Sequence, residues 1–261
     1  MSKIIVSAIF VIFCYAQIFG GTVETFNLKN GIKVIYKKTD TVDIVSLKIY
    51  SAVSIFNEDV SKAGVTYLLY SVMNKSTKKR DANTLSEDIE NLGSSINSEV
   101  EYDYSGFSLT AMSENFDQTL EILSDIITNP VFDEKELEKE KALNIEVIKN
   151  RQDSIKTTAH DKLIFDFYGN SHPYSYPIYG KIETLKNITR QDLIDMYNKI
   201  YFSKGIVITV VGNVSKQSLQ KSLEKYFSSI KLDNEILRPN IVPVVNIKNK
   251  DIEVASKFNQ A

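Results

Sequence analysis

Residues 61–74 combine helical periodicity with apolar side chains around most of the helix, and this constrains the fold of the 261-residue chain. The apolar positions recur at spacings of one, three and four residues, and they are Val65, Leu68, Leu69, Val72 and Met73. A surface helix carries one apolar stripe, whereas a helix that is apolar over most of its circumference is buried. We therefore predict that the chain folds around this helix, which is followed by a basic loop.

The chain is predicted to open with strands, to continue mainly with helices and to return to a strand and a helix near its end. Residues 24–38 indicate a hairpin, because apolar residues alternate on both sides of Asn30-Gly31, a strong two-residue turn signal. Further strands are expected at residues 42–52, 94–102, 105–112 and 206–211. Further helices are expected at residues 84–92, with a capping box from Thr84 to Glu87, and at 114–128, 134–152, 156–168, 189–202 and 215–228. This order predicts an α+β fold, with a mixed or antiparallel sheet that helices cover mainly on one face.

The composition is typical of a globular protein, with 43% hydrophobic and 25% charged residues. The net charge is −2 and no long basic tract occurs, so no nucleic-acid partner is predicted. Lys78, Lys79 and Arg80 form a short basic run, which we interpret as a solvated loop.

The first residues resemble a signal peptide. Lys3 gives a positive start, residues 4–15 are apolar, and cleavage is expected after Ala16, so residues 1–16 would be removed. The apolar run is shorter than the roughly 20 residues of a membrane span, although an uncleaved N-terminal anchor remains open. We expect an exported protein, periplasmic or secreted, with no membrane contact beyond this segment. Cys14 is the single cysteine, so no disulfide or catalytic thiol is expected after cleavage.

Several segments resemble the N-terminal half of the pitrilysin and mitochondrial-processing-peptidase family, the inverted zincins. The similar segments are residues 30–34, 63–80, 89–97, 129–140, 172–180 and 210–214. The resemblance implies one half of a processing-peptidase clamshell. Residues 24–230 would form the peptidase-like domain, and residues 231–261 a linker and the start of a missing second half.

The zinc motif of that family, H-x-x-E-H, is replaced in this chain. The resemblance places the two His ligands at Tyr67 and Ser71, the base Glu at Tyr70 and the third ligand, a Glu, at Val147. We therefore expect no catalytic residue, no metal ligand and no cofactor, although the family uses zinc. Two family positions are kept, at Glu140 on the second long helix and at His172 in an H-P-Y loop.

Other interpretations of these residues were weighed. A zinc site would require His160, His172 and a carboxylate to converge, because the chain has no other His and no Cys after the signal segment. A nucleophilic role for Ser71 would need an adjacent base, and no such pattern is visible. We expect Tyr67, Tyr70 and Ser71 to fill the volume of the metal site. Glu140 is either an ordinary residue of a solvated helix face or a residue with a remaining role.

The resemblance leaves four hypotheses for function. The first is an exported, non-catalytic homologue of a zinc metallopeptidase, which is a partner or substrate-holding subunit of an active zinc peptidase. The second is a stand-alone peptide-binding or scaffold domain, and the third is the remnant of a truncated gene. The fourth is an active zinc metalloendopeptidase. The expected partners are accordingly an active zinc-peptidase subunit and peptides.

Overall fold

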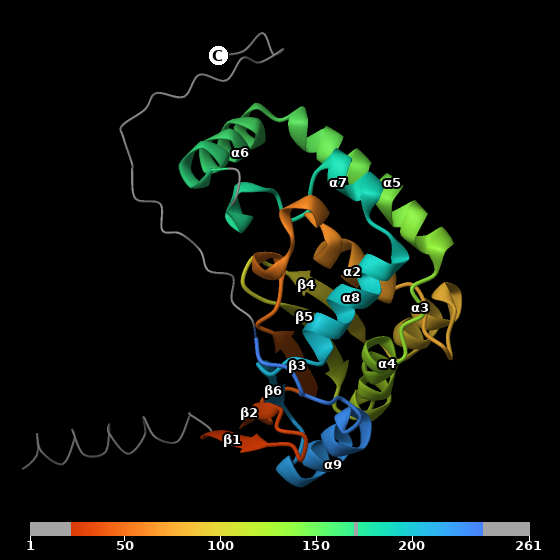
Figure 1. The fold of residues 1–261 in the computed structure, drawn as a ribbon. Helices are drawn as coiled ribbons and strands as arrows, with labels where there is room; N and C mark the ends of the chain where they lie inside the picture. The colour runs from red at the N-terminus through yellow and green to blue at the C-terminus, as the bar shows by residue number, and fades with distance from the viewer. Residues whose placement is uncertain (1–21, 170–171, 237–261) are drawn as a thin grey trace, which may run out of the picture.

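The computed structural model describes residues 22–169 and 172–236, and in these residues it contains one six-stranded sheet and eight α-helices (Figure 1). The predicted signal peptide and residues 237–261 of the predicted linker lie outside the described residues. Within the described ranges, no helix is both long enough and apolar enough to cross a membrane.

The sheet is mixed, with the strand order β1-β2-β6-β3-β5-β4. Its strands are β1 (Val23–Asn27), β2 (Lys33–Lys38), β3 (Ile44–Ser51), β4 (Ser95–Val100), β5 (Ser105–Met112) and β6 (Ile206–Gly212). β2 and β6 pair in parallel and every other neighbouring pair is antiparallel, which confirms the predicted sheet type.

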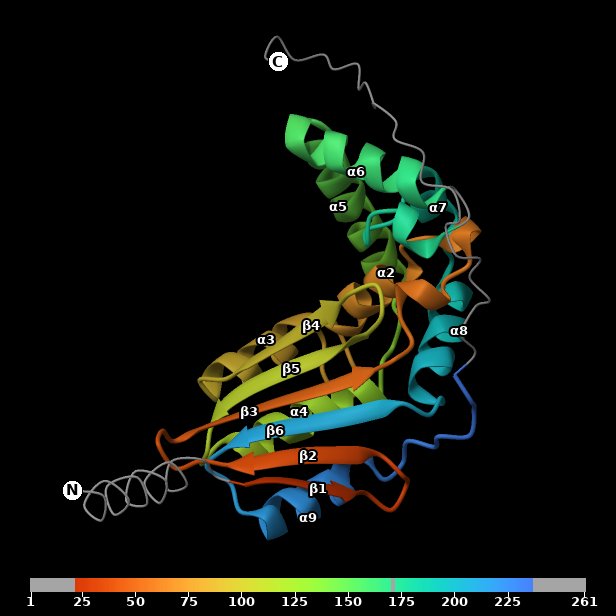
Figure 2. The same ribbon diagram turned by 90° about the vertical axis from the view of Figure 1, so that its left-hand side faces the viewer.

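The helices are α2 (Val65–Met73), α3 (Ala82–Asn91), α4 (Phe116–Thr128), α5 (Glu134–Gln152), α6 (Ile155–Tyr168), α7 (Ile182–Asn187), α8 (Arg190–Tyr201) and α9 (Lys216–Phe227). Three 3₁₀ turns accompany them, η1 (Ile55–Asn57), η2 (Val60–Lys62) and η3 (Pro173–Ser175). Both views place α5, α6 and α7 beyond one end of the sheet, with α2 between them and the strands (Figures 1 and 2).

The alternation of β3 shows which face of the sheet is buried. Val45, Leu47 and Ile49 are at most 2% exposed, whereas the side chain of Lys48 between them is 45% exposed. Figure 2 shows α4 and α9 behind the sheet, which turns its other face to the viewer. The core therefore lies between the sheet and these helices, as predicted for a sheet covered mainly on one face.

Some element boundaries differ from the prediction. The helix predicted from residue 61 begins at Val65, because Gly64 has a left-handed φ of 95° and residues 60–62 form a separate turn. The predicted capping box at Thr84 is wrong, since Asp81 caps α3 and accepts a hydrogen bond from the Thr84 amide. The short helix α7 was not predicted.

Candidate functional site

α2 and α5 carry the positions of the family zinc ligands, and the two helices pack against each other (Figure 1). α2 begins where its backbone meets the end of the H-P-Y loop. A side chain at Gly64 would place its Cβ 2.7 Å from the carbonyl oxygen of Tyr179 and 2.9 Å from the Cα of Gly180. The start of the helix is therefore fixed by backbone contact with residues more than a hundred positions later.

Tyr70, at the position of the base Glu, is 1% exposed. Its ring centroid lies 5.1 Å from that of Phe107, and its hydroxyl accepts a 3.4 Å hydrogen bond from Tyr201. Burial raises the pKa of Tyr70 to about 12. The hydroxyl stays protonated at neutral pH, so it cannot act as a general base there.

The three expected ligand positions have different environments. Tyr67 is partly buried, with its ring centroid 4.8 Å from that of Tyr179 in an edge-to-face arrangement, and burial raises its pKa. Ser71 is partly buried, and Val147 is 37% exposed. Burial of Tyr70 and partial burial of Tyr67 and Ser71 agree with the packing role expected for these three residues. Glu146, the neighbour of Val147, is also exposed.

Glu140 is 9% exposed, so the interpretation as a residue of a solvated helix face is wrong. Its carboxylate lies 3.1 Å from the Lys75 ammonium at the end of α2. Burial of Glu140 and its contact with Lys75 give it a structural role between α2 and α5. Asn144, one helical turn further along α5, is 4% exposed, and its Nδ2 has no hydrogen-bond partner among the described residues.

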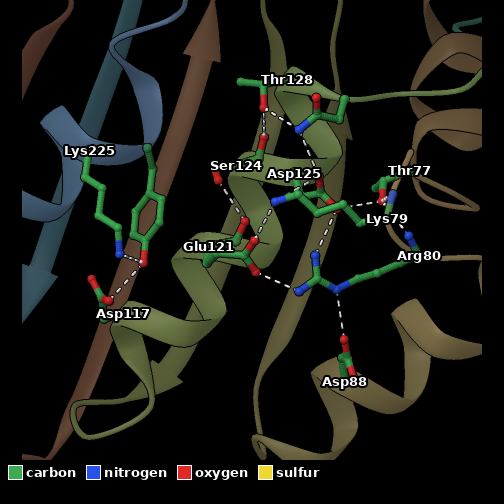
Figure 3. Close-up of polar contacts among 12 residues, drawn as sticks. Thr77, Lys79, Arg80, Asp88, Asp117, Glu121, Ser124, Asp125, Thr128 and Lys225 are labelled. Carbon is green, nitrogen blue, oxygen red and sulfur yellow. Dashed lines mark hydrogen bonds and ion pairs between the residues drawn. The ribbon is translucent and has the colours of Figure 1, made fainter.

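The basic loop after α2 is not simply solvated, and the interpretation of Arg80 as part of a solvated loop is wrong. Figure 3 shows Arg80 directed at acidic residues of α4 and α3. Its guanidinium donates to Asp125 at 2.9 Å, to Glu121 at 2.7 Å and to Asp88 at 2.8 Å. Asp125 is 1% exposed and also accepts a 2.6 Å hydrogen bond from Thr77.

The sequence reasoning missed this ion-pair cluster, which fixes the loop between α2 and α3. A signal was available, because Asp125 is next to Ile126 and one helical turn after Ile122, on a helix rich in apolar residues. A carboxylate on the buried face of a helix requires a cation or several donors. Lys79 is 58% exposed at its side chain, so for this residue the solvated interpretation is correct.

The two histidines lie on different elements. His172 begins η3, where its Nδ1 accepts a hydrogen bond from the Tyr174 amide at 3.1 Å. His160 lies on α6 with its side chain 67% exposed, 3.6 Å from Asp161. Among the described residues, no group of three or more His, Cys, Asp or Glu side chains could hold a metal ion. The loop role expected for His172 matches its contacts.

A polar groove of about 660 Å³ runs between α3 and β4. β4 is the last strand of the sheet, and in the described part of the chain it pairs with β5 alone. The lining includes Asn74, Ser86 and Lys139 together with residues 94–98. An edge strand has backbone donors and acceptors that no neighbouring strand uses, so an extended peptide can pair with it.

The sheet, the buried α2 and the long α5 beside it define the class, which is one half of a metallopeptidase-like clamshell. The chain belongs to the insulinase family, peptidase family M16. The profile described as "Insulinase (Peptidase family M16)" matches residues 33–180, and the "Peptidase M16 inactive domain" profile matches residues 187–260. The family resemblance stated from the sequence is confirmed.

Relatives and solved structures agree with this assignment. An "Uncharacterized zinc protease" of Rickettsia felis is 29% identical over 88% of this chain and 57% of that protein. The mitochondrial-processing peptidase subunit beta of Caenorhabditis elegans is 28% identical over 78% of this chain and 44% of that subunit. The chain thus spans about half the length of the curated relatives it matches.

Among solved structures, the peptidase M16 inactive domain from Pseudomonas fluorescens superposes with a TM-score of 0.77 at 20% identity, covering 83% of this chain and 52% of that one. A protease from Helicobacter pylori gives a TM-score of 0.76 at 23% identity, covering 85% and 54% of the two chains. These likenesses show the fold of a half-domain of this family.

Proposed function

We propose that this chain is an exported, non-catalytic member of family M16 that holds peptides as the partner of an active zinc peptidase subunit. The observation that carries the proposal is the environment of Tyr70. At the position where the family places its catalytic base, the chain has a phenol that is buried against Phe107 and bonded to Tyr201. A water-activating base must reach a reactive water, and Tyr70 is closed inside the core.

The residues at the ligand positions support the same conclusion. Zinc in catalytic sites is bound by three protein ligands, usually His, Glu, Asp or Cys. Tyr67, Ser71 and Val147 offer two hydroxyls and an isopropyl group, and burial raises the pKa of the phenol further above its ordinary value. This donor set does not fit a zinc ion, so no step of the proposed function uses one.

The groove between α3 and β4 supports peptide holding. Backbone pairing along β4 would give affinity for an extended segment without requiring a particular sequence. Asn74 donates to Ser98 Oγ at 3.0 Å, so the end of α2 contacts this strand. A peptide in the groove would lie beside the helix on which active relatives are expected to carry their zinc ligands. In this place, the peptide could be held for cleavage by a second, active chain.

Pairing and export are supported by the comparisons and the sequence respectively. One relative is by its name a subunit of a peptidase, and a family model described as an inactive domain matches residues 187–260. The first 16 residues have the features of a signal peptide.

The test combines activity, binding and partner capture. The purified chain is expected to leave unfolded peptides intact with added zinc, and a tagged copy is expected to capture a stoichiometric zinc-peptidase chain from its own cell envelope. Hydrolysis that a chelator abolishes would refute the non-catalytic assignment. A folded, well-expressed chain that binds peptides but captures no such partner would instead be a stand-alone peptide-binding domain.

Peptide binding at β4 has a matched pair of variants. Ser86 lines the groove, whereas its neighbour Glu87 is an exposed residue of α3 outside the groove lining. Ser86→Trp should fill the groove and weaken binding of a labelled extended peptide, whereas Glu87→Trp should not. Equal affinities of the two variants would place peptide binding elsewhere.

A further inference from the structure

A second pocket lies beyond the end of the sheet, apart from the α3–β4 groove. It has a volume of about 360 Å³ and is enclosed by the end of α5, by α6, by the loop after η3 and by the start of α7. Its lining shares no residue with the groove at β4. A cavity of this size is within the range of pockets that bind small ligands.

The walls of this pocket are largely apolar. They include Ile148 of α5, Phe165 of α6, Pro177 of the loop and Ile182 of α7. The Tyr176 ring completes them, with its centroid 6.2 Å from that of Phe165. Transfer of an apolar ligand side chain from water into this pocket would therefore be favourable.

Two cations line the same pocket. The Lys181 ammonium lies 3.6 Å from the centroid of the Tyr176 ring. It forms no salt bridge among the residues the structure describes, and the charge of Glu183 acts on it. Burial lowers the pKa of Lys181. Burial removes water that stabilises the charged ammonium, and an anion beside it would stabilise that charged form instead.

Arg151 is the second cation. Its guanidinium lies 5.4 Å from the centroid of Tyr179 and donates to the Asp161 carboxylate through one nitrogen at 3.3 and 3.4 Å. Because a guanidinium has five N–H donors, this ion pair leaves donors for a further acceptor. The acidic residues in the lining are Asp161, which is paired with Arg151, and Glu183, which is exposed.

We propose that this pocket binds the C-terminal carboxylate of a peptide whose last side chain is apolar, with Lys181 and Arg151 on the carboxylate and the apolar walls around the side chain. The choice of a peptide rests on the proposed function, and the pocket adds a second site that selects free chain ends. A carboxylate held by two cations in a partly apolar site forms charge-assisted hydrogen bonds, which are stronger than neutral ones.

The experiment compares a fluorescein-labelled octapeptide that ends in a free Phe carboxylate with the same peptide ending in an amide. Fluorescence anisotropy of the full chain should give an affinity for the free acid at least about tenfold higher than for the amide. Lys181→Met should remove this difference. Lys186→Met, on the exposed side of the same helix, should leave it intact.

Three outcomes would overturn the inference: equal affinities for acid and amide, an unchanged preference in Lys181→Met, or a preference that disappears in the groove variant Ser86→Trp. If Lys181→Met unfolds, Arg151→Gln takes its place and should weaken the preference. Binding of decanoate in a calorimetric titration, without binding of the peptide acid, would assign the pocket to another carboxylate and refute the peptide. Binding of both peptides alike would refute this pocket while leaving the proposed function intact, whereas binding of neither would also refute peptide holding.

Discussion

The hydroxyl oxygens of Tyr70 and Tyr201 lie 3.4 Å apart in the core, on helices α2 and α8 that are far apart in the sequence. The two side chains are 1% and 4% exposed. Burial raises the pKa of both phenols. Tyr70, at the position of the family base, thus links α2 to α8, and the core side chains pack around its phenol ring.

Introducing the family base should therefore disrupt the fold. We expect Tyr70→Glu to lower the free energy of unfolding by more than about 3 kcal/mol, because a carboxyl group replaces a ring between Phe107 and Tyr201. Tyr70→Phe keeps the ring and loses one hydrogen bond, so its cost should be about 1 kcal/mol. Urea unfolding of the two variants measures both values. A Tyr70→Glu variant as stable as Tyr70→Phe would show that the site tolerates a carboxylate.

The strands were predictable because their side chains alternate and their turns carry local signals. Asn30-Gly31 predicted the first hairpin, and Gly31 has the left-handed φ of 91° that the turn requires. The order of the sheet could not be predicted, since β6 lies between β2 and β3 through pairings that span more than 150 residues. α7 was missed because its six residues are too short for a helical period to be visible.

The candidate site was only partly visible in the sequence. The apolar periodicity of α2 predicted burial near Tyr70, and α2 is the most buried region of the site. It could not predict that Arg80 reaches Asp125 across 45 residues, because an ion pair between distant elements leaves no periodic pattern. The two interpretations of Glu140 could not be separated from the sequence, since the charged sequence around it resembles a solvated helix face.

Because Arg80 pairs with the buried Asp125, we expect replacement of Arg80 to destabilise the fold far more than replacement of its neighbour Lys79. Arg80→Met should cost about 3–5 kcal/mol, because it leaves the buried Asp125 carboxylate without its guanidinium partner. Lys79→Met removes an exposed cation of the same loop and should cost less than about 1 kcal/mol. Chemical denaturation tests both variants. The double variant Arg80→Met with Asp125→Leu should recover part of the loss, and no recovery would argue against an uncompensated charge as its cause.

The close contact between Gly64 and Gly180 predicts that a side chain at Gly64 destabilises the fold through a steric clash, in addition to the strain of the left-handed backbone. Gly64 and Gly31 have nearly the same left-handed φ, 95° and 91°, but a Cβ would meet other atoms only at Gly64. Gly31→Ala should therefore cost about 1 kcal/mol, the strain of the conformation alone. Gly64→Ala should cost at least about 2 kcal/mol more, since the chain carrying Gly180 must move. Thermal unfolding compares the two variants, and equal losses would show that the helix start can shift freely.

Glu58 predicts how stability changes with pH. Its carboxylate accepts hydrogen bonds from the amides of Gly64 at 2.9 Å and Thr66 at 2.7 Å. Burial raises the pKa of Glu58 from 4.5 to about 7, and this effect outweighs the two hydrogen bonds, which lower the pKa. The folded state therefore binds more protons than the unfolded state between these pH values. The free energy of unfolding should fall by up to about 3 kcal/mol as the pH rises from about 4.5 to about 7, and the contribution should be level above that range. Urea unfolding across this range should show the slope in the wild type and in Asp59→Asn, whose carboxylate is exposed. Glu58→Gln cannot titrate and should lack it, so a slope equal to that of the wild type would assign the pH dependence to another group.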